Sequence, residues 1–326
     1  MSIARAHSNI ALIKYWGKRH EVLKLPTNGS LSLTLDALYT DTRVSYRADL
    51  TQDQLVLNGA PAPEAMRLRV SRFLDLLRQT HGYSAYAEVV SANSFPTGAG
   101  LASSASAFAA LTLAATAAAG LQLSPRQLSQ LARQGSGSAC RSIFGGFAEW
   151  LPGTADADAS SYAEGLKTEL PVWMAVLVLN QGHKATGSGD GMARTVATSP
   201  LYSVWPATAS ADLQALKAAL AAGDLAAVGE LMEHNALAMH ATALAARPPV
   251  IYWQPETLAL IQHVQQLRSA GHACWFTIDA GPNIKVLLPA GAEATLQALR
   301  SHPAVQQVFC CSTGPAAHLN PAEPLV

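Results

Sequence analysis

Residues 96–106 read PTGAGLASSAS and lead directly into an uncharged, alanine-rich stretch. A loop of small residues at the start of a helix is typical of a phosphate-binding site, because the free N–H groups and the positive end of the helix dipole point at the anion. Gly98 and Gly100 allow the backbone to approach that anion closely. Hydroxyl groups for phosphate oxygens or a bound Mg²⁺ come from Ser103, Ser104 and Ser106. The stretch therefore predicts a protein that handles a phosphorylated compound.

The same stretch is long enough to suggest a membrane span. Residues 101–121 contain no charged side chain, and about 20 apolar residues can cross a bilayer. Ala, Ser and Thr nevertheless dominate where Leu, Ile and Phe would be expected, and no aromatic belt or basic flank marks either end. We therefore expect a buried helix of a soluble protein that packs closely against a sheet, and no membrane partner.

Composition narrows the class of protein further. The 326 residues are 49% hydrophobic and 13% charged, which suits a large core and two domains. Lys and Arg equal Asp and Glu at 22 each, so no overall charge attracts nucleic acid, and we expect no such partner. The four cysteines have no metal-site spacing, and the adjacent pair Cys310 and Cys311 is expected within a core strand. The N-terminal residues show no apolar signal core, so we expect a cytoplasmic protein.

Hydrophobic periodicity predicts an α/β protein with a change in organisation near residue 180. In the first part we expect helices at residues 63–80, 101–121 and 125–134, and strands at 42–46, 54–57, 83–90, 144–151 and 172–180. In the second part we expect helices at 209–222, 225–244, 255–270 and 293–301, and strands at 273–278, 284–288 and 305–311. The predicted domains are therefore residues 1–180 and 181–326.

Four segments have the composition of a binding site. Apolar residues flank Lys14 on both sides. Its ammonium group is therefore either half-buried beside an anion, or it extends to solvent while the aliphatic part of the side chain is buried. Residues 135–141 form a second glycine/serine cluster that ends in Arg141, which is either an anion receptor or an ordinary loop. Asp279 ends an apolar strand before a Gly-Pro turn, where it either faces a cleft or caps the turn. Residues 183–191 read as a mobile loop and a possible lid, with Lys184 and Ser188 as its polar groups.

Several common sites are absent from the sequence. The chain contains no G-x-x-x-x-G-K-[ST] loop and no G-x-S-x-G nucleophile motif. No G-x-G-x-x-G follows a strand as a dinucleotide site requires. Its histidines lack the spacing of metal ligands, so we do not expect a histidine metal site.

Taken together, the motifs resemble the GHMP kinase superfamily and, within it, the diphosphomevalonate decarboxylase family. They occur in that family's order at residues 9–19, 25–34, 95–107, 135–146, 195–201, 233–244, 248–253 and 277–283. The resemblance therefore covers nearly the whole chain. The loop at 96–106 is shared across the superfamily, whereas the KYWGK run at 14–18 and the DAGPN run at 279–283 are specific to the decarboxylases.

The resemblance implies a two-domain GHMP kinase fold. An N-terminal α/β domain and a C-terminal ferredoxin-like α/β domain would enclose the active-site cleft. It also implies ATP-dependent decarboxylation of mevalonate 5-diphosphate to isopentenyl diphosphate, ADP, phosphate and CO₂, with Mg²⁺ as cofactor and a homodimer as the assembly.

Roles for individual residues follow from the matching motifs. Asp279 resembles the catalytic carboxylate, and Lys14 would lie beside it. The substrate contacts would be Tyr15, Lys18, Ser136, Ser138 and Arg141. The ATP contacts would be Pro96, Gly98, Gly100, Leu101, Ala102, Ser103, Ser104 and Ser106, with Ser103 and Ser104 nearest the metal.

The chain departs from the family at two places. His20 stands where an acidic residue is common, and residues 185–190 offer fewer hydrogen-bond donors than the corresponding loop of relatives. The second departure leaves open whether the substrate carries one or two 5-phosphates, and three alternatives stand beside the leading hypothesis. They are a mevalonate 5-phosphate decarboxylase, a mevalonate 3-kinase, and a regulator that binds ligand and ATP without turnover.

Overall fold

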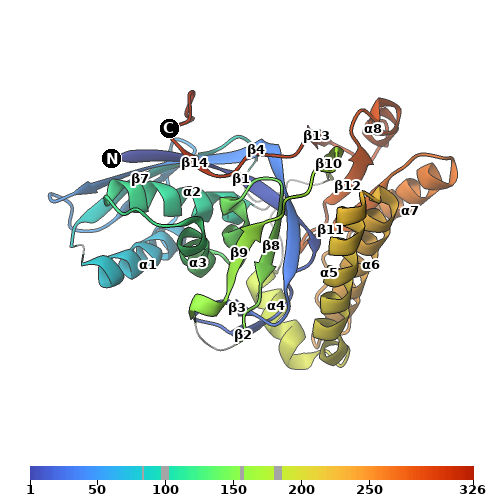
Figure 1. Cartoon of the computed structure of the whole chain (residues 1–326), viewed down its shortest axis with the longest axis horizontal. Helices are drawn as coiled ribbons and strands as arrows, with labels where there is room; N and C mark the ends of the chain where they lie inside the picture. The colour runs from blue at the N-terminus through green and yellow to red at the C-terminus, as the bar shows by residue number, and fades with distance from the viewer. Residues whose placement is uncertain (83, 97–102, 155–157, 180–185) are drawn as a thin grey trace.

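Two long strands, β1 (Ser2–Ile13) and β4 (Ser30–Arg47), pair antiparallel at the centre of the first sheet. The computed structural model describes residues 1–82, 84–96, 103–154, 158–179 and 186–326. It orders this sheet β14-β1-β4-β7-β5-β6, and β8 and then β9 extend it from β4. The remaining strands are β5 (Gln54–Leu57), β6 (Ala60–Pro61), β7 (Tyr86–Asn93), β8 (Phe147–Leu151), β9 (Tyr162–Gly165) and β14 (His318–Leu319). Through β14 the C-terminal segment returns to the N-terminal strand (Figure 1).

Three helices cover one face of this sheet. They are α1 (Glu64–His81), α2 (Ser103–Ala118) and α3 (Pro125–Gly135), and the 3₁₀ helix η1 (Gly137–Ile143) follows α3. The alanines of α2 are buried against the sheet, as expected for a helix whose small side chains allow close packing. Ser124 begins α3 with a capping box, because its hydroxyl accepts from the Gln127 N–H and the Gln127 side chain accepts from the Ser124 N–H.

The second sheet is antiparallel, with strand order β11-β12-β10-β13. Its strands are β10 (Val172–Val178), β11 (Trp275–Ile278), β12 (Ile284–Pro289) and β13 (Gln307–Cys311). Met174, Val176 and Val178 face α5 (Trp205–Ala222) and α6 (Leu225–Leu244). The alternate residues of β10 face α7 (Pro255–Ser269) and α8 (Glu293–Arg300) on the other side. This alternation is what a sheet buried on both faces requires.

One hydrophobic core joins the two sheets. It contains Leu31 and Leu33 of β4, Met174 and Val176 of β10, and Leu216 of α5, all fully buried. Figure 1 shows α5 and α6 side by side on the outer side of this core. Because both sheets share buried apolar surface, their relative position is held by packing as well as by the chain that connects them.

The structure confirms most of the predicted helices and corrects two regions. β1 was not predicted, because residues 6–13 are all buried and show no alternation of polar and apolar positions. The expected loop at 183–191 is wrong for its second part, since residues 188–191 belong to α4 (Ser188–Thr198). Three-residue or shorter elements complete the fold: β2 (Lys18–His20), β3 (Leu25–Pro26), η2 (Asp158–Ser160) and η3 (Tyr202–Val204).

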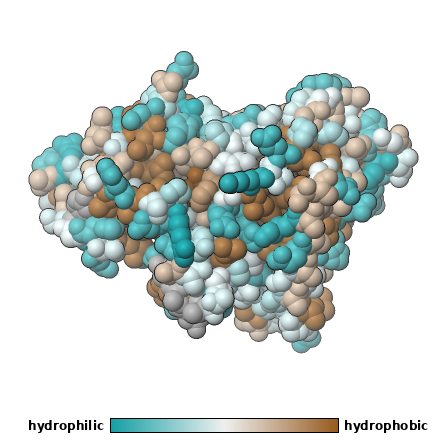
Figure 2. All heavy atoms as spheres, viewed as in Figure 1, coloured by the Kyte–Doolittle hydropathy of each residue, from teal (hydrophilic) through white to brown (hydrophobic). Residues whose placement is uncertain are grey.

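No helix within the described residues is both long and apolar enough to cross a bilayer. Figure 2 shows hydrophilic and hydrophobic residues intermixed over the face in view. The domain boundary at residue 180 stays a prediction, and β10 (Val172–Val178), which precedes it, pairs with the second sheet.

Candidate active site

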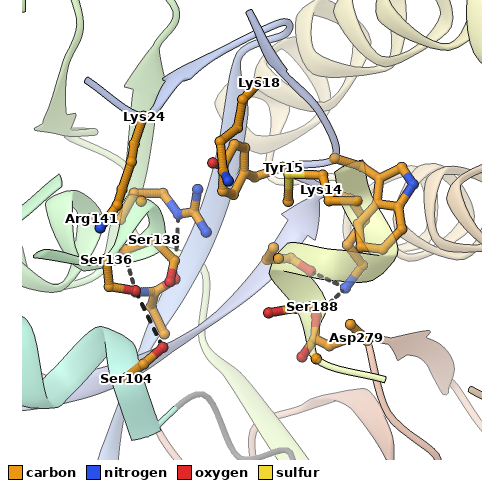
Figure 3. Close-up of a pocket in the computed structure, with 18 of the residues that line it drawn as sticks. Lys14, Tyr15, Lys18, Lys24, Ser104, Ser136, Ser138, Arg141, Ser188 and Asp279 are labelled. Atoms are coloured by element: carbon orange, nitrogen blue, oxygen red, sulfur yellow. Dashed lines mark hydrogen bonds and ion pairs between the residues drawn. The ribbon is translucent and has the colours of Figure 1, made fainter. Parts of the chain in front are cut away.

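A cavity of about 670 Å³ opens where the two halves meet. Its walls come from the end of β1, the first turn of α2, η1, the first turn of α4 and the turn after β11. In Figure 3 two groups of polar side chains face each other across it. One group contains Lys14, Asp279 and Ser188, and the other contains Arg141 with the serines of η1 and α2.

Lys14 and Asp279 form an ion pair at one side of the cavity. The Lys14 ammonium donates to Asp279 Oδ1 at 2.7 Å and to the Ala11 carbonyl at 2.8 Å. Lys14 is 2% exposed and Asp279 is 25% exposed. The carboxylate is therefore the more accessible partner, as the interpretation of Asp279 as a cleft residue requires.

The backbone of Lys14 is held by two asparagines. Its N–H donates to Asn235 Oδ1 at 2.7 Å, and its carbonyl accepts from Asn28 Nδ2 at 2.9 Å. Asn235 lies on α6, and its own amide donates to Asp212 Oδ2 of α5 at 2.8 Å. Helices of the second half thus position a lysine that follows the first strand of the chain.

A second lysine contacts the same carboxylate. Lys285 of β12 lies 3.0 Å from Asp279 Oδ2 and is 1% exposed. Burial alone would raise the pKa of Asp279, but the two ammonium groups and their hydrogen bonds hold that pKa well below its usual range. Burial lowers the pKa of Lys14, and the Asp279 carboxylate opposes that effect.

Arg141 is the buried cation on the opposite side. Its Nε donates to Ser32 Oγ at 2.9 Å and to Asn9 Oδ1 at 3.3 Å, and its Nη1 donates to Ser30 Oγ. Burial lowers the pKa of this guanidinium, and no ion pair within the described residues includes it. A buried guanidinium that has only neutral hydrogen-bond partners is suited to bind an anionic ligand.

The serines near Arg141 connect two elements. Ser104 Oγ of α2 lies 3.2 Å from Oγ of Ser136, which follows α3 directly, and both residues line the cavity. The carbonyl of Ser138 accepts from Asn9 Nδ2 at 3.1 Å, and Ser138 also lines the cavity. The second glycine/serine cluster therefore lies beside the first turn of α2, as a site with two neighbouring anions requires.

Tyr15 and Lys18 line the cavity between the two groups. The ring of Tyr15 packs against Trp150 with centroids 4.6 Å apart, and burial raises the pKa of its hydroxyl. The close approach of Tyr15 to η1 requires glycine at 137, because a Cβ there would lie 2.8 Å from the tyrosine ring. Lys18 donates to Glu21 Oε2 at 2.6 Å.

The predicted ATP loop is described only at its two ends. Residues 97–102, with Gly98, Gly100, Leu101 and Ala102, lie outside the described residues, whereas Pro96 is described and half-buried. Ser103 and Ser104 form the first turn of α2 and line the cavity. Ser106 is fully buried, and its Oγ lies 2.7 Å from Thr40 Oγ1, so its role in ATP binding stays a prediction.

Part of the possible lid is described. Lys184 lies outside the described residues, whereas Ser188 begins α4 and lines the cavity. His20, one of the departures from the family, belongs to β2, and its Nδ1 accepts from the Leu23 N–H at 3.2 Å.

Three cations of this region were not predicted from the sequence. Lys285 lies two residues after the DAGPN run, and the only feature that could have identified it is its position inside an apolar strand. Lys24 and Arg69 line the cavity, and both donate to the Gly135 carbonyl. Burial, with the neighbouring charges of Arg69 and Lys18, lowers the pKa of Lys24 to about 8. Arg69 could not be singled out in the sequence, because it is one of several arginines in α1.

The chain is similar to one family of proteins over almost its whole length. Residues 6–163 match a family model described as the diphosphomevalonate decarboxylase-like N-terminal domain, and residues 174–319 match the mevalonate 5-diphosphate decarboxylase C-terminal domain. Diphosphomevalonate decarboxylase of Aspergillus fumigatus is 39% identical over 296 residues, which cover 84% of this chain and 73% of that protein.

Solved structures agree with the sequence relatives. Mevalonate diphosphate decarboxylase from Staphylococcus aureus superposes with a TM-score of 0.94 at 42% identity, covering 98% of both chains. A structure described as MDDEF in complex with MVAPP, AMPPCP and magnesium superposes with a TM-score of 0.93 at 46% identity, again over 98% of both chains. The predicted two-domain GHMP kinase fold is confirmed. The chain belongs to the diphosphomevalonate decarboxylase family.

Proposed function

We propose that this chain catalyses the ATP-dependent decarboxylation of mevalonate 5-diphosphate to isopentenyl diphosphate, ADP, phosphate and CO₂. The observation that carries the proposal is the Lys14–Asp279 pair, which faces buried Arg141 and the first turn of α2 across one cavity. The relatives carry the same activity in their names, and a similar structure binds MVAPP with an ATP analogue. ATP and Mg²⁺ are therefore its cofactors.

The chemistry explains why one cavity must hold two anions. The tertiary hydroxyl of the substrate is a poor leaving group, whereas its phosphate ester can depart. Departure leaves positive charge on the tertiary carbon, and the carboxylate two carbons away then loses CO₂ to form the alkene. The site must first neutralise a phosphoryl group in transfer and then stabilise a cationic carbon.

Lys14 would serve the first stage. Two of its three N–H bonds are directed to Ala11 and Asp279, and the residue lines the cavity. The third N–H would bind a phosphoryl oxygen as charge develops on it. Because Lys14 is almost fully buried, that interaction would be stronger than the same contact in water.

Asp279 would serve both stages. Its low pKa keeps it ionised, so it is a weak proton acceptor and a fixed negative charge. It would orient the tertiary hydroxyl during phosphoryl transfer and stabilise the positive carbon afterwards. Arg141, Ser136, Ser138, Tyr15 and Lys18 would bind the diphosphate and the carboxylate of the substrate.

The described residues fit a nucleotide with its metal. Ser103 and Ser104 present hydroxyls at the N-terminus of α2, where helical N–H groups favour phosphate. Asp279 is the one carboxylate among the described lining residues, and two lysines already pair with it. Mg²⁺ would therefore be held through phosphate oxygens with a serine hydroxyl, and when bound it would neutralise charge on the transferring phosphoryl group.

The number of phosphates on the substrate can be tested directly. Purified protein is given ATP, Mg²⁺ and mevalonate that carries no, one or two 5-phosphates, while ADP and CO₂ are measured together. We expect both products from mevalonate 5-diphosphate alone. Turnover of the monophosphate would indicate a mevalonate 5-phosphate decarboxylase, ADP without CO₂ would indicate a 3-kinase, and binding without either product would indicate a regulator.

A homodimer and a cytoplasmic location complete the proposal. The homodimer is what the resemblance to the family implies, and four free cysteines support a reducing compartment. Light scattering on the purified protein should give twice the 34.2 kDa chain mass, and a value of 34.2 kDa would contradict the dimer. Cell fractionation followed by the decarboxylase assay tests the location.

A further inference from the structure

Asp279 is held from two sides, and only one of them faces the cavity. Its Oδ1 accepts from Lys14, which lines the cavity, at 2.7 Å. Its Oδ2 lies 3.0 Å from Lys285 Nζ, and Lys285 is not among the described residues that line the cavity. One ammonium group therefore contacts each oxygen, and this arrangement restricts rotation of the carboxylate about its last side-chain bond.

The hairpin of β11 and β12 places Lys285 behind the carboxylate. Lys285 pairs with Thr277 across the two strands, and Asp279 comes directly after β11. The Lys285 ammonium also donates to the Asn283 carbonyl at 3.3 Å, within the same turn. The lysine and the aspartate thus belong to one rigid unit, which the substrate would meet only through Asp279.

The second lysine changes the net charge of this side of the cavity. Two ammonium groups and one carboxylate leave one positive charge, whereas Lys14 and Asp279 alone would be neutral. The other titratable groups that act on this carboxylate are His240 of α6 and Arg141 of η1. Burial lowers the pKa of His240 to about 3, so it is neutral near pH 7, and Arg141 stays charged.

Burial of the Lys285 ammonium group does not favour folding. On either side of it in the sheet, Lys285 pairs with Val176 of β10 and Thr277 of β11, which are both fully buried. Transfer of an ammonium group from water into such a buried position is unfavourable, and apolar residues of similar volume are often at least as stable there. A functional role for the charge accounts for its presence in the strand.

We propose that Lys285 is a positioning residue of the decarboxylase site, which fixes the orientation and the ionised state of Asp279 and leaves Lys14 net charge for the phosphoryl group. This inference rests on the proposed function of the site. Lys285 itself would not contact the substrate, since it is not among the described residues that line the cavity.

Three substitutions of Lys285 separate the effect of its charge from the effect of its size. Lys285→Met removes the charge and nearly keeps the length of the side chain, and Lys285→Gln keeps an N–H donor group without charge. Lys285→Arg keeps the charge. Lys217→Met is the matched control, because Lys217 pairs with buried Glu149 at 2.6 Å and does not line the cavity.

The expected kinetic result is a loss in kcat rather than in affinity. For Lys285→Met and Lys285→Gln we expect kcat to fall about 10- to 100-fold, as for other residues that orient a catalytic group, with KM for mevalonate 5-diphosphate changed by less than about threefold. Loss of the Lys285 charge raises the pKa of Asp279, so activity should begin to fall at a higher pH during acidification. Lys285→Arg should keep the acidic limb of the wild-type pH–rate profile. Lys217→Met should keep both this acidic limb and the wild-type kcat.

The carboxyl pKa can also be measured without turnover. Carbon NMR of aspartate-labelled protein, assigned with Asp279→Asn, should show Asp279 titrating at a higher pH in Lys285→Gln than in wild type. A wild-type enzyme without ATP-dependent CO₂ release would contradict the proposed function itself. If the wild type is active but Lys285→Met and Lys285→Gln keep its kcat and the acidic limb of its pH–rate profile, the proposed role of Lys285 is wrong and the proposed function of the site is unaffected. If Lys285→Met does not fold, the Gln and Arg variants decide, since they must differ in the acidic limb.

Discussion

At the scale of single residues, the site contains buried charged groups, some paired with opposite charges and one bonded only to neutral groups. Asp279 has two lysine partners, whereas Arg141 has only hydroxyl and amide partners within the described residues. The first arrangement keeps a carboxylate ionised, and the second leaves a guanidinium ready for an external anion. This difference is why we assign charge stabilisation to Asp279 and anion binding to Arg141.

Asp279→Asn tests the first assignment. The amide is nearly the same size but uncharged, so it cannot stabilise a cationic carbon, and it leaves two buried ammonium groups without a counter-ion. We expect ADP formation and CO₂ release to fall together, by about 10³-fold or more. Both products are measured in single-turnover assays, with circular dichroism as the control for folding. Near-full CO₂ release by this variant would show that another group carries out the chemistry.

Lys24 should make anion binding dependent on pH. Burial lowers the pKa of Lys24 to about 8, so the side chain is a cation below that pH and loses its charge as the pH rises through it. Affinity for the anionic ligands should therefore decrease in that direction, with KM rising about five- to tenfold from about pH 7 to about pH 9.5. Steady-state kinetics over this range are compared with Lys24→Met, in which KM should be high and flat. Parallel profiles for the two proteins would rule out Lys24 as the titrating group.

At the scale of secondary-structure elements, close packing between α2 and α3 sets the geometry of the serine groups. Gly135 ends α3, and a Cβ at that position would lie 2.1 Å from Cδ1 of Phe108 in α2. Ser136 follows directly and contacts Ser104. A change in the distance between the two helices would therefore move both halves of the anion site.

Gly135→Ala should disturb fold and site together. The added methyl group forces Phe108 to move, at a cost of about 1–3 kcal/mol in the free energy of unfolding, and KM for ATP should rise. Chemical denaturation and ATP kinetics provide the measurement. Gly189→Ala is the control for stability, because a Cβ there meets no atom within 4 Å and helix α4 tolerates alanine. Equal stability of both variants with wild type would contradict the close packing at Gly135.

The elements also show how far the sequence predicted the structure. Helices α1, α3 and α6 were predicted within one or two residues, because each has an apolar face or clear end signals. β1 could not be found by alternation, since both of its faces are buried. Lys14, Arg141 and Asp279 were found through their motifs, whereas Lys285 and Asn235 act through contacts between segments far apart in the chain. Such contacts have no local pattern.

At the scale of the whole molecule, the cavity depends on how the two halves are joined. Asp279 and Asn235 come from the second half, and Lys14 comes from the first. The shared core between β4, β10 and α5 is fully buried. The halves are therefore expected to unfold as one cooperative unit.

Thermal unfolding tests this coupling. Tryptophan fluorescence and far-ultraviolet circular dichroism should give one transition with the same midpoint, because loss of either sheet exposes the common core. Tryptophans lie in both halves, at Trp16 and Trp150 and at Trp205 and Trp275, so the fluorescence reports on both. Two separate transitions would show that the halves are independent and that the cavity is held by the linking chain.

The ratio of CO₂ to ADP from mevalonate 5-diphosphate tests the central claim most directly. Wild-type protein with ATP and Mg²⁺ is given substrate labelled in its carboxyl carbon, and trapped labelled CO₂ is counted against ADP from the same reaction. The structure predicts one CO₂ for each ADP, because the site that phosphorylates the tertiary hydroxyl also holds the charge that stabilises loss of the carboxylate. ADP that accumulates without labelled CO₂, or no ADP at all, would contradict the assignment of this cavity as a decarboxylase site.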